Sequence, residues 1–341
     1  MLTNPPETSP SQEINQSLAE FCKTDGAKKF HRQRHLLDTG GLSQEEVQAI
    51  LDTTKSAKHI FSKNKQPLNL LNDKIVATIF YENSTRTKSS FDLAARNLGA
   101  RVIHLDVTTS SVTKGETIGD TAKTLVAMGV DALVQRHSSS GAAHQLQSVI
   151  AKPISIINAG DGWNAHPTQA LLDLFTMEEI CKNIEGKKVA IIGDIKHSRV
   201  ARSNIRLLVP RGADVHLCAP PTLMPEGIAR MGVTIHDQLS PAIDNADFIM
   251  SLRMQTERQQ DGLITSLEDY RRLYRLDHNR LKTAKPAVRV LHPGPMNRGI
   301  ELTSELADDL DISLIQQQVT NGIYTRMAVL LLLLFSEDGT R

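Results

Sequence analysis

Residues 80–99 read FYENSTRTKSSFDLAARNLG, and this stretch predicts how the chain around it folds. It ends the run of residues 74–80, KIVATIF, which is apolar and rich in β-branched side chains, as in a buried strand of a parallel sheet. Apolar residues then recur at helical spacing, and Gly99 stands where a helix C-terminus favours glycine. We therefore predict a strand, a tight turn and a helix.

The start of this predicted helix carries Ser84, Thr85, Arg86, Thr87 and Lys88. The first turn of a helix is the positive end of its dipole, so two cations there are unfavourable unless an anion lies among them. Backbone N–H groups, hydroxyls and a guanidinium that converge at one point suit a phosphate. A solvated capping turn explains a lone STRT motif equally well, so the motif alone leaves both interpretations open.

Composition indicates a chain of about two domains, because 341 residues exceed one typical domain. Its 39 Lys and Arg against 38 Asp and Glu give a net charge of +1, which favours neither nucleic acid nor an anionic membrane as a partner. Three distant cysteines without a C-x-x-C pair indicate no disulfide framework and no zinc site. A reducing, cytoplasmic setting is the simplest interpretation.

The two ends of the chain differ in character. Residues 1–35 carry three prolines and little periodicity up to about residue 30, so we expect a polar extension that is mobile or loosely docked. It lacks the apolar region of a secretory signal. The most apolar run, residues 327–335, is far shorter than the roughly 20 residues of a membrane-spanning helix. We predict a buried core helix there.

Strand and helix patterns alternate along the rest of the chain, which predicts doubly wound parallel sheets. In the first series, the predicted strands are 74–80, 101–106, 132–135 and 154–157. In the second series, which follows a predicted helix over 167–181, they are 188–192, 214–218, 233–236, 248–251 and 288–292. The expected fold is α/β, with two tandem parallel-sheet domains and the active site in the cleft between them, beyond the carboxyl ends of the strands.

In the first series, polar residues follow the predicted strands. The hydroxyl-rich loop 108–117 has Lys114 as its one cation, so it can reach an anion or be an ordinary exposed loop. Arg136 ends an apolar strand, where it points into the cleft or caps the sheet edge. His166 at a helix start is biased towards neutrality and can donate to a carbonyl oxygen. Gln169 shares its face and can recognise an amide, although capping and packing explain an isolated pair as well.

The second series begins with a strand and Gly193 but lacks G-x-G-x-x-G, which excludes the dinucleotide-binding motif. Arg199 stands at a predicted helix start. Arg253 and Gln255 follow a strand two residues apart, so in an extended segment they share a face and can hold a carboxylate. Residues 292–295, HPGP, leave backbone carbonyls as acceptors. Together these features indicate acyl or carbamoyl transfer by positioning and electrostatic stabilisation, without a covalent intermediate.

Four motifs carry a family resemblance: STRT at 84–87, KGE at 114–116, HPTQ at 166–169 and HPGP at 292–295. In this order and spacing the chain resembles the catalytic chains of the aspartate carbamoyltransferase family over about residues 36–335. The resemblance implies attack of the L-aspartate amine on carbamoyl phosphate, an early step of pyrimidine synthesis, with no metal and no organic cofactor. It also implies a carbamoyl-phosphate domain over 36–166 and 314–335 and an aspartate domain over 167–313.

The resemblance further implies the roles of individual residues. The catalytic group would be Arg86, Thr87, Lys114, Arg136 and His166. Carbamoyl phosphate would be bound by Ser84, Thr85, Arg86, Thr87, Ser110, Arg136, His166, Gln169, Pro293 and Gly294. L-Aspartate would be bound by Lys114, Arg199, Arg253 and Gln255. Some family members have leucine where this chain has Gly294, which weakens any inference from that side chain. Ser110 rather than Ser111 is a choice of alignment.

The same resemblance implies a homotrimer in which the loop with Ser110 and Lys114 enters the neighbouring subunit's active site. A regulatory or dihydroorotase-like partner chain is a further expectation, and the N-terminal extension would be its contact. Ornithine carbamoyltransferase is the nearest alternative, but that family has a His-Cys-Leu-Pro stretch where this chain has HPGP. A catalytically silent scaffold homologue is the other alternative, against which an intact set of ligand residues argues.

Overall fold

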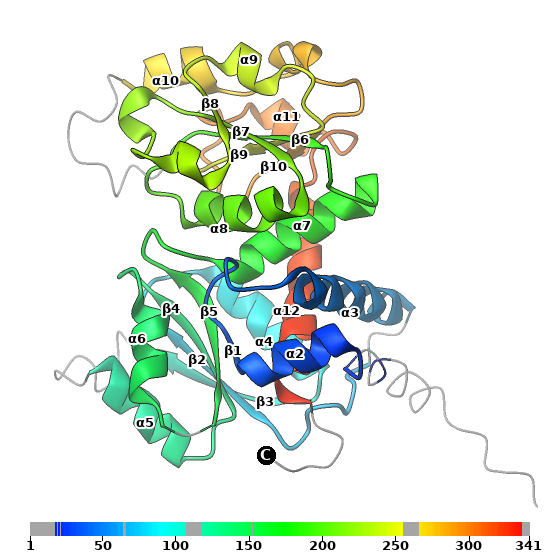
Figure 1. Cartoon of the computed structure of the whole chain (residues 1–341), viewed down its shortest axis with the longest axis vertical. Helices are drawn as coiled ribbons and strands as arrows, with labels where there is room; N and C mark the ends of the chain where they lie inside the picture. Colours follow the sequence, from blue (N-terminus) through cyan, green and yellow to red (C-terminus); the bar gives the residue numbers. More distant parts are fainter. Residues whose placement is uncertain are drawn as a thin grey trace, which may run out of the picture. The chain divides into compact units, whose positions relative to one another are not determined.

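The computed structural model describes residues 18, 20, 22–63, 66–106, 117–151, 153–254 and 266–335. The chain divides into unit 1, made of Met1–Leu37, Leu42–Ala159 and Gly322–Arg341, and unit 2, made of Asp38–Gly41 and Gly160–Asn321. Each unit has a five-stranded parallel sheet with helices packed on it (Figure 1). The predicted α/β class with two parallel sheets is confirmed. The boundaries between the two units differ from the predicted domain boundaries at residues 166/167 and 313/314. That one predicted domain binds carbamoyl phosphate and the other L-aspartate stays a prediction.

The sheet of unit 1 has the strand order β1-β5-β4-β2-β3. Its strands are β1 (His35–Leu36), β2 (Ile75–Phe80), β3 (Arg101–Asp106), β4 (Ala132–His137) and β5 (Ser155–Asp161). The inner strand β2 is buried from its second residue to its last, because it pairs with β3 on one side and β4 on the other. The chain runs from β2 to β3 and then returns to the other side of β2, so the order reverses between β2 and β4.

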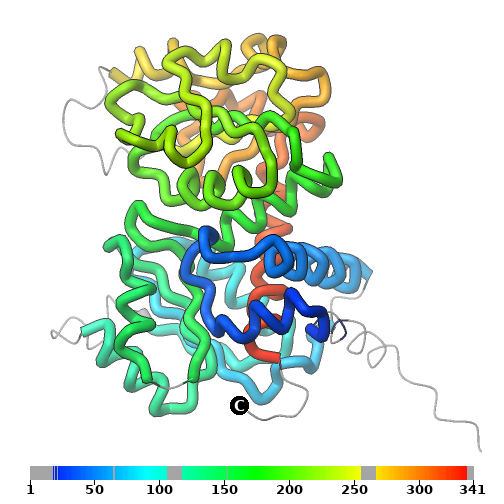
Figure 2. The backbone as a smooth tube through the Cα atoms, in the orientation of Figure 1, coloured from blue at the N-terminus to red at the C-terminus, as the bar shows by residue number. Residues whose placement is uncertain are grey.

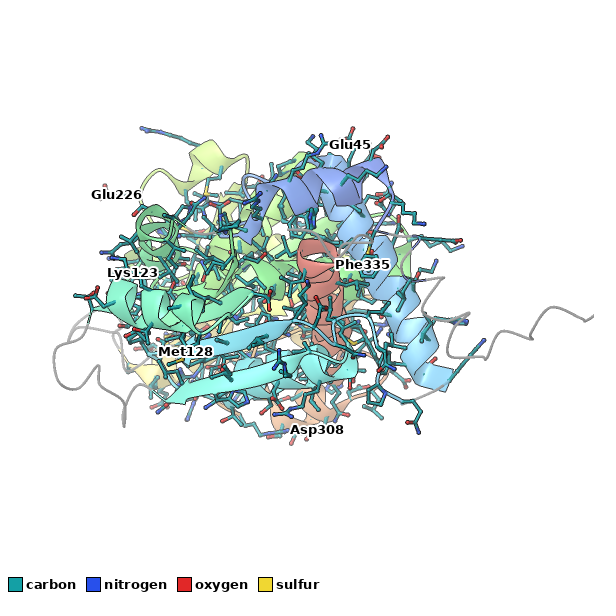
Figure 3. The ribbon with its side chains drawn as sticks, turned by 90° about the horizontal axis from the view of Figure 1, so that it is seen from below. Glu45, Lys123, Met128, Glu226, Asp308 and Phe335 are labelled. Carbon is teal, nitrogen blue, oxygen red and sulfur yellow. The ribbon has the colours of Figure 1, made fainter. Side chains whose placement is uncertain are left out.

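Helices cover both faces of this sheet. They are α2 (Asp25–Gln33), α3 (Gln44–Lys63), α4 (Thr85–Asn97), α5 (Ile118–Ala127), α6 (Ala142–Val149) and the part of α12 (Ile315–Leu334) from Gly322 onward. Leu125 of α5 and Leu146 of α6 pack with Ile79 and Leu133 of the sheet in one apolar cluster. Lys123 and Met128, on and just after α5, are exposed at the surface (Figure 3).

The predicted N-terminal extension is partly ordered, which corrects the expectation of a mobile or loosely docked segment for residues 25–33. These residues form α2, which lies beside α3 (Figure 2). Phe30 is completely buried, and the Thr24 hydroxyl caps the helix by accepting from the Ala27 N–H at 3.2 Å. A Cβ on Gly26 would lie 2.3 Å from the backbone oxygen of Glu45, so glycine allows the close approach of the two helices.

The sheet of unit 2 has the order β10-β9-β6-β7-β8, and this order reverses between β6 and β9. Its strands are β6 (Lys188–Ile192), β7 (Asp214–Cys218), β8 (Thr234–His236), β9 (Phe248–Ser251) and β10 (Arg289–Leu291). Its helices are α7 (Pro167–Cys181), α8 (Arg199–Leu208), α9 (Leu239–Ile243), α10 (Leu267–Tyr274), α11 (Ser304–Asp308) and the start of α12. Short 3-10 turns occupy η3 (Val209–Arg211), η4 (Pro221–Leu223), η5 (Ile228–Met231) and η7 (Arg280–Thr283).

The predicted core helix near the C-terminus is confirmed. It forms the end of α12, in which residues 327–334 are all at most 6% exposed. Among the described residues, no helix combines the length and the apolar character needed to span a membrane.

Candidate active site

In each unit, predicted site residues lie at or just beyond the carboxyl ends of the two strands between which the strand order reverses. In unit 1, Ser84 to Thr87 follow β2, and Arg136 lies near the end of β4. In unit 2, Arg199 follows β6 and Arg253 follows β9. Ligands of open α/β sheets bind at such reversal points, beyond the carboxyl ends of the strands. Each sheet therefore places its predicted site residues where its topology favours a ligand.

The start of α4 offers backbone N–H groups to an anion. Ser84 is the N-cap residue with extended backbone angles, φ −159° and ψ 92°, and its side chain makes no capping hydrogen bond. The first turn of the helix carries no acidic residue. Thr87 is 6% exposed, whereas Thr85 and Arg86 are exposed. The first N–H groups of a helix have no acceptor within it, so this turn can receive a phosphate.

Arg136 is held beside that turn by the sheet register. It pairs with Phe80, the last residue of β2, and its carbonyl accepts from the Tyr81 N–H at 2.9 Å. One guanidinium nitrogen lies 3.0 Å from Glu82 Oε2, and another donates to the Ala159 carbonyl at 3.2 Å. The side chain is only 13% exposed, so this ion pair is partly shielded from water. The sequence indicated Arg136, but it gave no sign that Glu82 would pair with it.

The start of α7 buries both predicted carbonyl and amide ligands. His166 is 4% exposed, and its backbone N–H donates to Ser203 Oγ at 2.8 Å. Gln169 is 8% exposed, and its amide nitrogen donates to Asp173 Oδ1 at 2.9 Å. Asp173 was not predicted, although a carboxylate one turn after Gln169 in a mostly apolar run of residues is a signal that the sequence contains.

The HPGP segment, residues 292–295, is hydrogen-bonded to helix α12. The backbone N–H of His292 donates to Gln318 Oε1 at 2.9 Å, and His292 Nδ1 accepts from the Gly294 N–H at 2.8 Å. Gly294 has φ 61°, in the left-handed region that favours glycine. Pro293 lies between these two anchored residues. The backbone of the segment is therefore fixed by hydrogen bonds at two places.

Arg199 and Arg253 emerge from neighbouring strands of unit 2. Arg199 is the first residue of α8 and is 6% exposed, and Ser198 Oγ caps this helix by accepting from the Ala201 N–H at 3.1 Å. The Leu252 N–H donates to the Ile192 carbonyl at 2.8 Å, which places the segment of Arg253 beside the turn that precedes α8.

Two buried carboxylates, Asp194 and Glu301, hold the segments that carry Arg199 and Arg253. The sequence did not indicate either carboxylate. Asp194 accepts from His197 Nδ1 at 2.9 Å in the turn before α8. Glu301 accepts from the backbone N–H groups of Met254 at 2.8 Å and Asn297 at 2.7 Å. Burial raises the pKa of Glu301, and the N–H groups that donate to it oppose that shift. Neither carboxylate lies in one of the four sequence motifs, which explains why both were missed.

Three predicted ligands, Ser110, Lys114 and Gln255, and the alternative Ser111, lie outside the described residues. The structure therefore leaves their roles as predictions. Within the described part of the chain, no three His, Cys, Asp or Glu side chains are grouped so that they could hold a metal ion.

Two family models match the chain. The model of the aspartate/ornithine carbamoyltransferase carbamoyl-P binding domain matches residues 34–179, and that of the Asp/Orn binding domain matches residues 185–333. Among curated proteins, the chain is 50% identical over 301 residues to an aspartate carbamoyltransferase catalytic subunit of Desulforudis audaxviator, covering 88% of this chain and 97% of that one. It is 47% identical over 311 residues to the subunit of the same description from Gloeobacter violaceus, covering 88% and 94%.

Solved structures show the same architecture. Aspartate transcarbamoylase from Trypanosoma cruzi, in complex with carbamoyl aspartate and phosphate, superposes with a TM-score of 0.79 at 31% identity, covering 89% of this chain and 96% of that one. Ornithine carbamoyltransferase from Pyrococcus furiosus superposes with a TM-score of 0.78 at 29% identity, covering 90% and 98%. The fold alone therefore does not separate the two substrates.

Proposed function

The chain belongs to the aspartate/ornithine carbamoyltransferase family, and from this membership we propose that it carbamoylates L-aspartate with the residues described above. The product is N-carbamoyl-L-aspartate, and the reaction supplies pyrimidine synthesis. The observation that carries the choice of substrate is the pair Arg199 and Arg253, which follow neighbouring strands at the reversal point of the second sheet. Two guanidinium groups suit the two carboxylates of aspartate.

Carbamoyl phosphate is bound through its phosphate at the start of α4. Ser84, Thr85, Arg86 and Thr87 provide hydroxyls, backbone N–H groups and a guanidinium, and the positive end of the helix dipole favours the dianion. Arg136 reaches the phosphate and the carbonyl oxygen by exchanging part of its pairing with Glu82 for the ligand.

The transfer step forms one bond and breaks one. The amine of L-aspartate attacks the carbonyl carbon, a C–N bond forms, and the C–O bond to phosphate breaks with its electron pair leaving on the phosphate. Thr87, Arg136 and His166 donate to the carbonyl oxygen, on which negative charge develops. The departing phosphate takes the proton of the amine, so the step needs no protein base. Gln169 and the backbone of Pro293 and Gly294 hold the carbamoyl NH₂ group.

The aspartate carboxylates are bound by Arg199, Arg253, Gln255 and Lys114. An ornithine side chain would instead bring an ammonium group towards a guanidinium, at a cost of about 4 kcal/mol for a separation of about 4 Å in a partly screened site. This repulsion favours L-aspartate over L-ornithine, in agreement with the descriptions of the curated relatives.

The assembly is a homotrimer in which Ser110 and Lys114 of one subunit complete the site of the next. The domain of residues 36–166 and 314–335 provides most of the carbamoyl phosphate ligands, and the domain of residues 167–313 provides most of the L-aspartate ligands. Cys22, Cys181 and Cys218 are thiols and form no disulfide, which supports a reducing, cytoplasmic location. A regulatory or dihydroorotase-like partner chain would contact the N-terminal segment.

A transfer assay tests the substrate directly. The full chain is incubated with carbamoyl phosphate and either L-aspartate or L-ornithine, and carbamoylated product and released phosphate are measured. We expect product with L-aspartate only. Turnover with L-ornithine alone would contradict the proposal, and a folded chain that turns over neither amino acid would favour the scaffold alternative.

A further inference from the structure

A fully buried carboxylate, Asp173, lies in the middle of α7 and receives three side-chain amides. Its Oδ1 accepts from Gln169 Nε2 at 2.9 Å and from Gln318 Nε2 at 2.7 Å. Its Oδ2 accepts from Asn204 Nδ2 at 2.9 Å. All four residues belong to unit 2. Asp173 is 0% exposed, so these contacts form without competition from bulk water.

The contact with Gln169 fixes which end of its amide remains for a ligand. An ionised carboxylate can only accept hydrogen bonds, so the group of Gln169 that faces Asp173 must be its NH₂. The oxygen, Oε1, is then the end of the Gln169 amide that is available to a ligand. In this orientation the Gln169 oxygen can accept from an N–H group of a ligand. In the opposite orientation the Gln169 NH₂ would face that N–H group, and two donors cannot form a hydrogen bond.

The contact with Gln318 extends this orientation to a second segment. Because Gln318 Nε2 donates to Asp173, its Oε1 is available to the backbone N–H of His292, at 2.9 Å. His292 in turn accepts from the Gly294 N–H at 2.8 Å. A continuous path of hydrogen bonds therefore runs from Gln169 through Asp173 and Gln318 to the segment with Gly294.

We propose that Asp173 is a positioning residue that makes the site selective for an acyl group bearing NH₂. It turns the Gln169 oxygen towards the carbamoyl N–H groups and steadies the segment whose backbone carbonyls accept from the same NH₂. This inference rests on the proposed function, in which Gln169 and Gly294 hold the carbamoyl amide. The new element is that an accepting oxygen of Asp173 creates the selectivity by orienting the Gln169 amide. The negative charge of Asp173 is not required for this effect.

Acetyl phosphate is the probe, because it carries CH₃ where carbamoyl phosphate carries NH₂. The dissociation constants of both compounds for the full chain are measured by calorimetry without any amino acid present. For wild type we expect a preference for carbamoyl phosphate. In Asp173→Leu, which has the same branching at Cγ but is larger and has no acceptor, we expect that preference to fall about 10- to 100-fold, mainly through weaker carbamoyl phosphate binding.

The conservative variant separates the acceptor from the charge. In Asp173→Asn, the side-chain oxygen can still accept from Gln169 and Gln318. The new NH₂ can donate to Asn204 Oδ1, a buried atom without a hydrogen-bond partner in this structure, once the Asn204 amide turns over and gives up its bond to the Val200 carbonyl. We expect this variant to keep the preference within about threefold of wild type. Equal losses in Asp173→Asn and Asp173→Leu would overturn the proposal, because they would assign the effect to the charge.

Two further variants control for folding. Thr176→Val alters a buried residue one turn along α7, whose hydroxyl donates to the Leu172 carbonyl at 2.7 Å and accepts from Asn321. It should lower the thermal midpoint and leave the preference unchanged. If Asp173→Leu does not fold, Gln169→Met, which lacks the amide, must lose the preference.

The two proposals fail in different ways. Retention of the preference in folded Asp173→Leu or Gln169→Met, or a wild type without any preference, would overturn the positioning role. A wild type that prefers carbamoyl phosphate but transfers its carbamoyl group to no amino acid would contradict the proposed function and leave the positioning role intact.

Discussion

Arg136 has a planar guanidinium that makes two contacts in different directions. It pairs with Glu82 at 3.0 Å and donates to the Ala159 carbonyl at 3.2 Å, so its position is set before any ligand is considered. A lysine ammonium is a point charge on a flexible stem and cannot reproduce this fork. The geometry of the arginine, as well as its charge, is therefore required for the carbonyl to be polarised in the proposed reaction.

Arg136→Lys should lower kcat/KM for carbamoyl transfer about 10²- to 10³-fold, because a donor aimed at the developing oxyanion is lost. Steady-state kinetics with both substrates measure this loss. Arg101→Lys, which alters an exposed arginine of the same sheet, is the matched control and should leave kcat/KM unchanged. Full activity in Arg136→Lys would show that a positive charge alone is sufficient at this position.

Gly294→Ala should lower stability by about 1–2 kcal/mol, because φ 61° is costly for a residue with a Cβ. It should also lower kcat/KM, since Gly294 belongs to the segment proposed to hold the carbamoyl amide. Gly141→Ala is the control, because Gly141 has a similar φ of 82° and belongs to no proposed site. A Cβ added at Gly141 would have no neighbouring atom within 4 Å, so the variant changes only the backbone preference. That variant should show a similar loss of stability in urea with normal kinetics.

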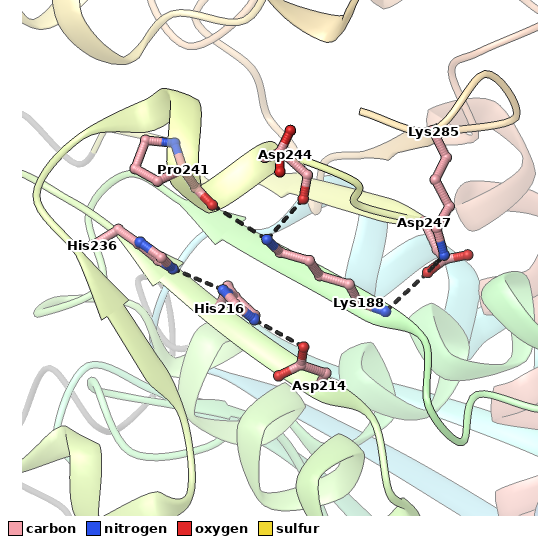
Figure 4. Close-up of polar contacts among 8 residues, drawn as sticks. All are labelled: Lys188, Asp214, His216, His236, Pro241, Asp244, Asp247 and Lys285. Atoms are coloured by element: carbon pink, nitrogen blue, oxygen red, sulfur yellow. Dashed lines mark hydrogen bonds and ion pairs between the residues drawn. The ribbon is translucent and has the colours of Figure 1, made fainter. Parts of the chain in front are cut away.

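At the scale of elements, β7 and β8 form a sheet edge with a polar face (Figure 4). His216 Nδ1 lies 2.7 Å from His236 Nε2, and His216 Nε2 lies 2.9 Å from Asp214 Oδ2. Burial lowers the pKa of His236, and the charges of His216 and Lys188 lower it further, while Asp237 and Asp214 oppose the shift.

The sign of the pH effect follows from this lowered pKa. The unfolded chain binds the proton on His236 more tightly than the folded chain, so stability is full above the ordinary value of 6.5 and declines as the pH falls below it. Urea midpoints at about pH 7.5 and about pH 5.5 should therefore differ more for wild type than for His236→Gln. His59→Gln, at an exposed position on α3, should shift both midpoints alike. An equal pH dependence in wild type and His236→Gln would contradict this assignment.

At the scale of the whole molecule, the proposed trimer divides each site between two chains. Arg86 belongs to unit 1 of one subunit, whereas Lys114 would come from its neighbour. Closed rings of identical subunits repeat the same contact at every interface. A trimer in which all three subunits carry the same substitution, at Arg86 or at Lys114, therefore lacks that residue in every site.

Mixing two inactive variants tests this arrangement. Arg86→Ala and Lys114→Ala chains, each inactive alone, should regain about a quarter of wild-type activity when mixed equally, because that share of sites receives both intact residues in randomly assembled three-membered rings. The assay is carbamoyl transfer after dissociation and reassembly, with unmixed samples treated identically as controls. If mixing restores no activity although mixed trimers form, Lys114 does not act across the interface.

The sequence by itself predicted most strands of the two sheets and suggested the chemistry of the site, which stays a prediction. Hydrophobic runs predicted the strands 101–106, 188–192, 214–218 and 248–251 and the helix 167–181 with their observed bounds, because buried strands and helices need continuous or periodic apolar residues. Arg136, Arg199 and Arg253 were predicted to follow strands. Arg136 lies instead near the end of β4, and the topology brings all three to the reversal points of the two sheets.

Only the tertiary structure decided which polar groups support these residues. Glu82 beside Arg136, Asp173 beside Gln169 and Glu301 beside the segment of Arg253 are held by contacts that no short motif encodes. The order of α2 likewise depends on Gly26, which permits a helix contact with a segment distant in the sequence. Local patterns report the environment of one segment, whereas hydrogen bonds between buried side chains depend on which segments the fold makes neighbours.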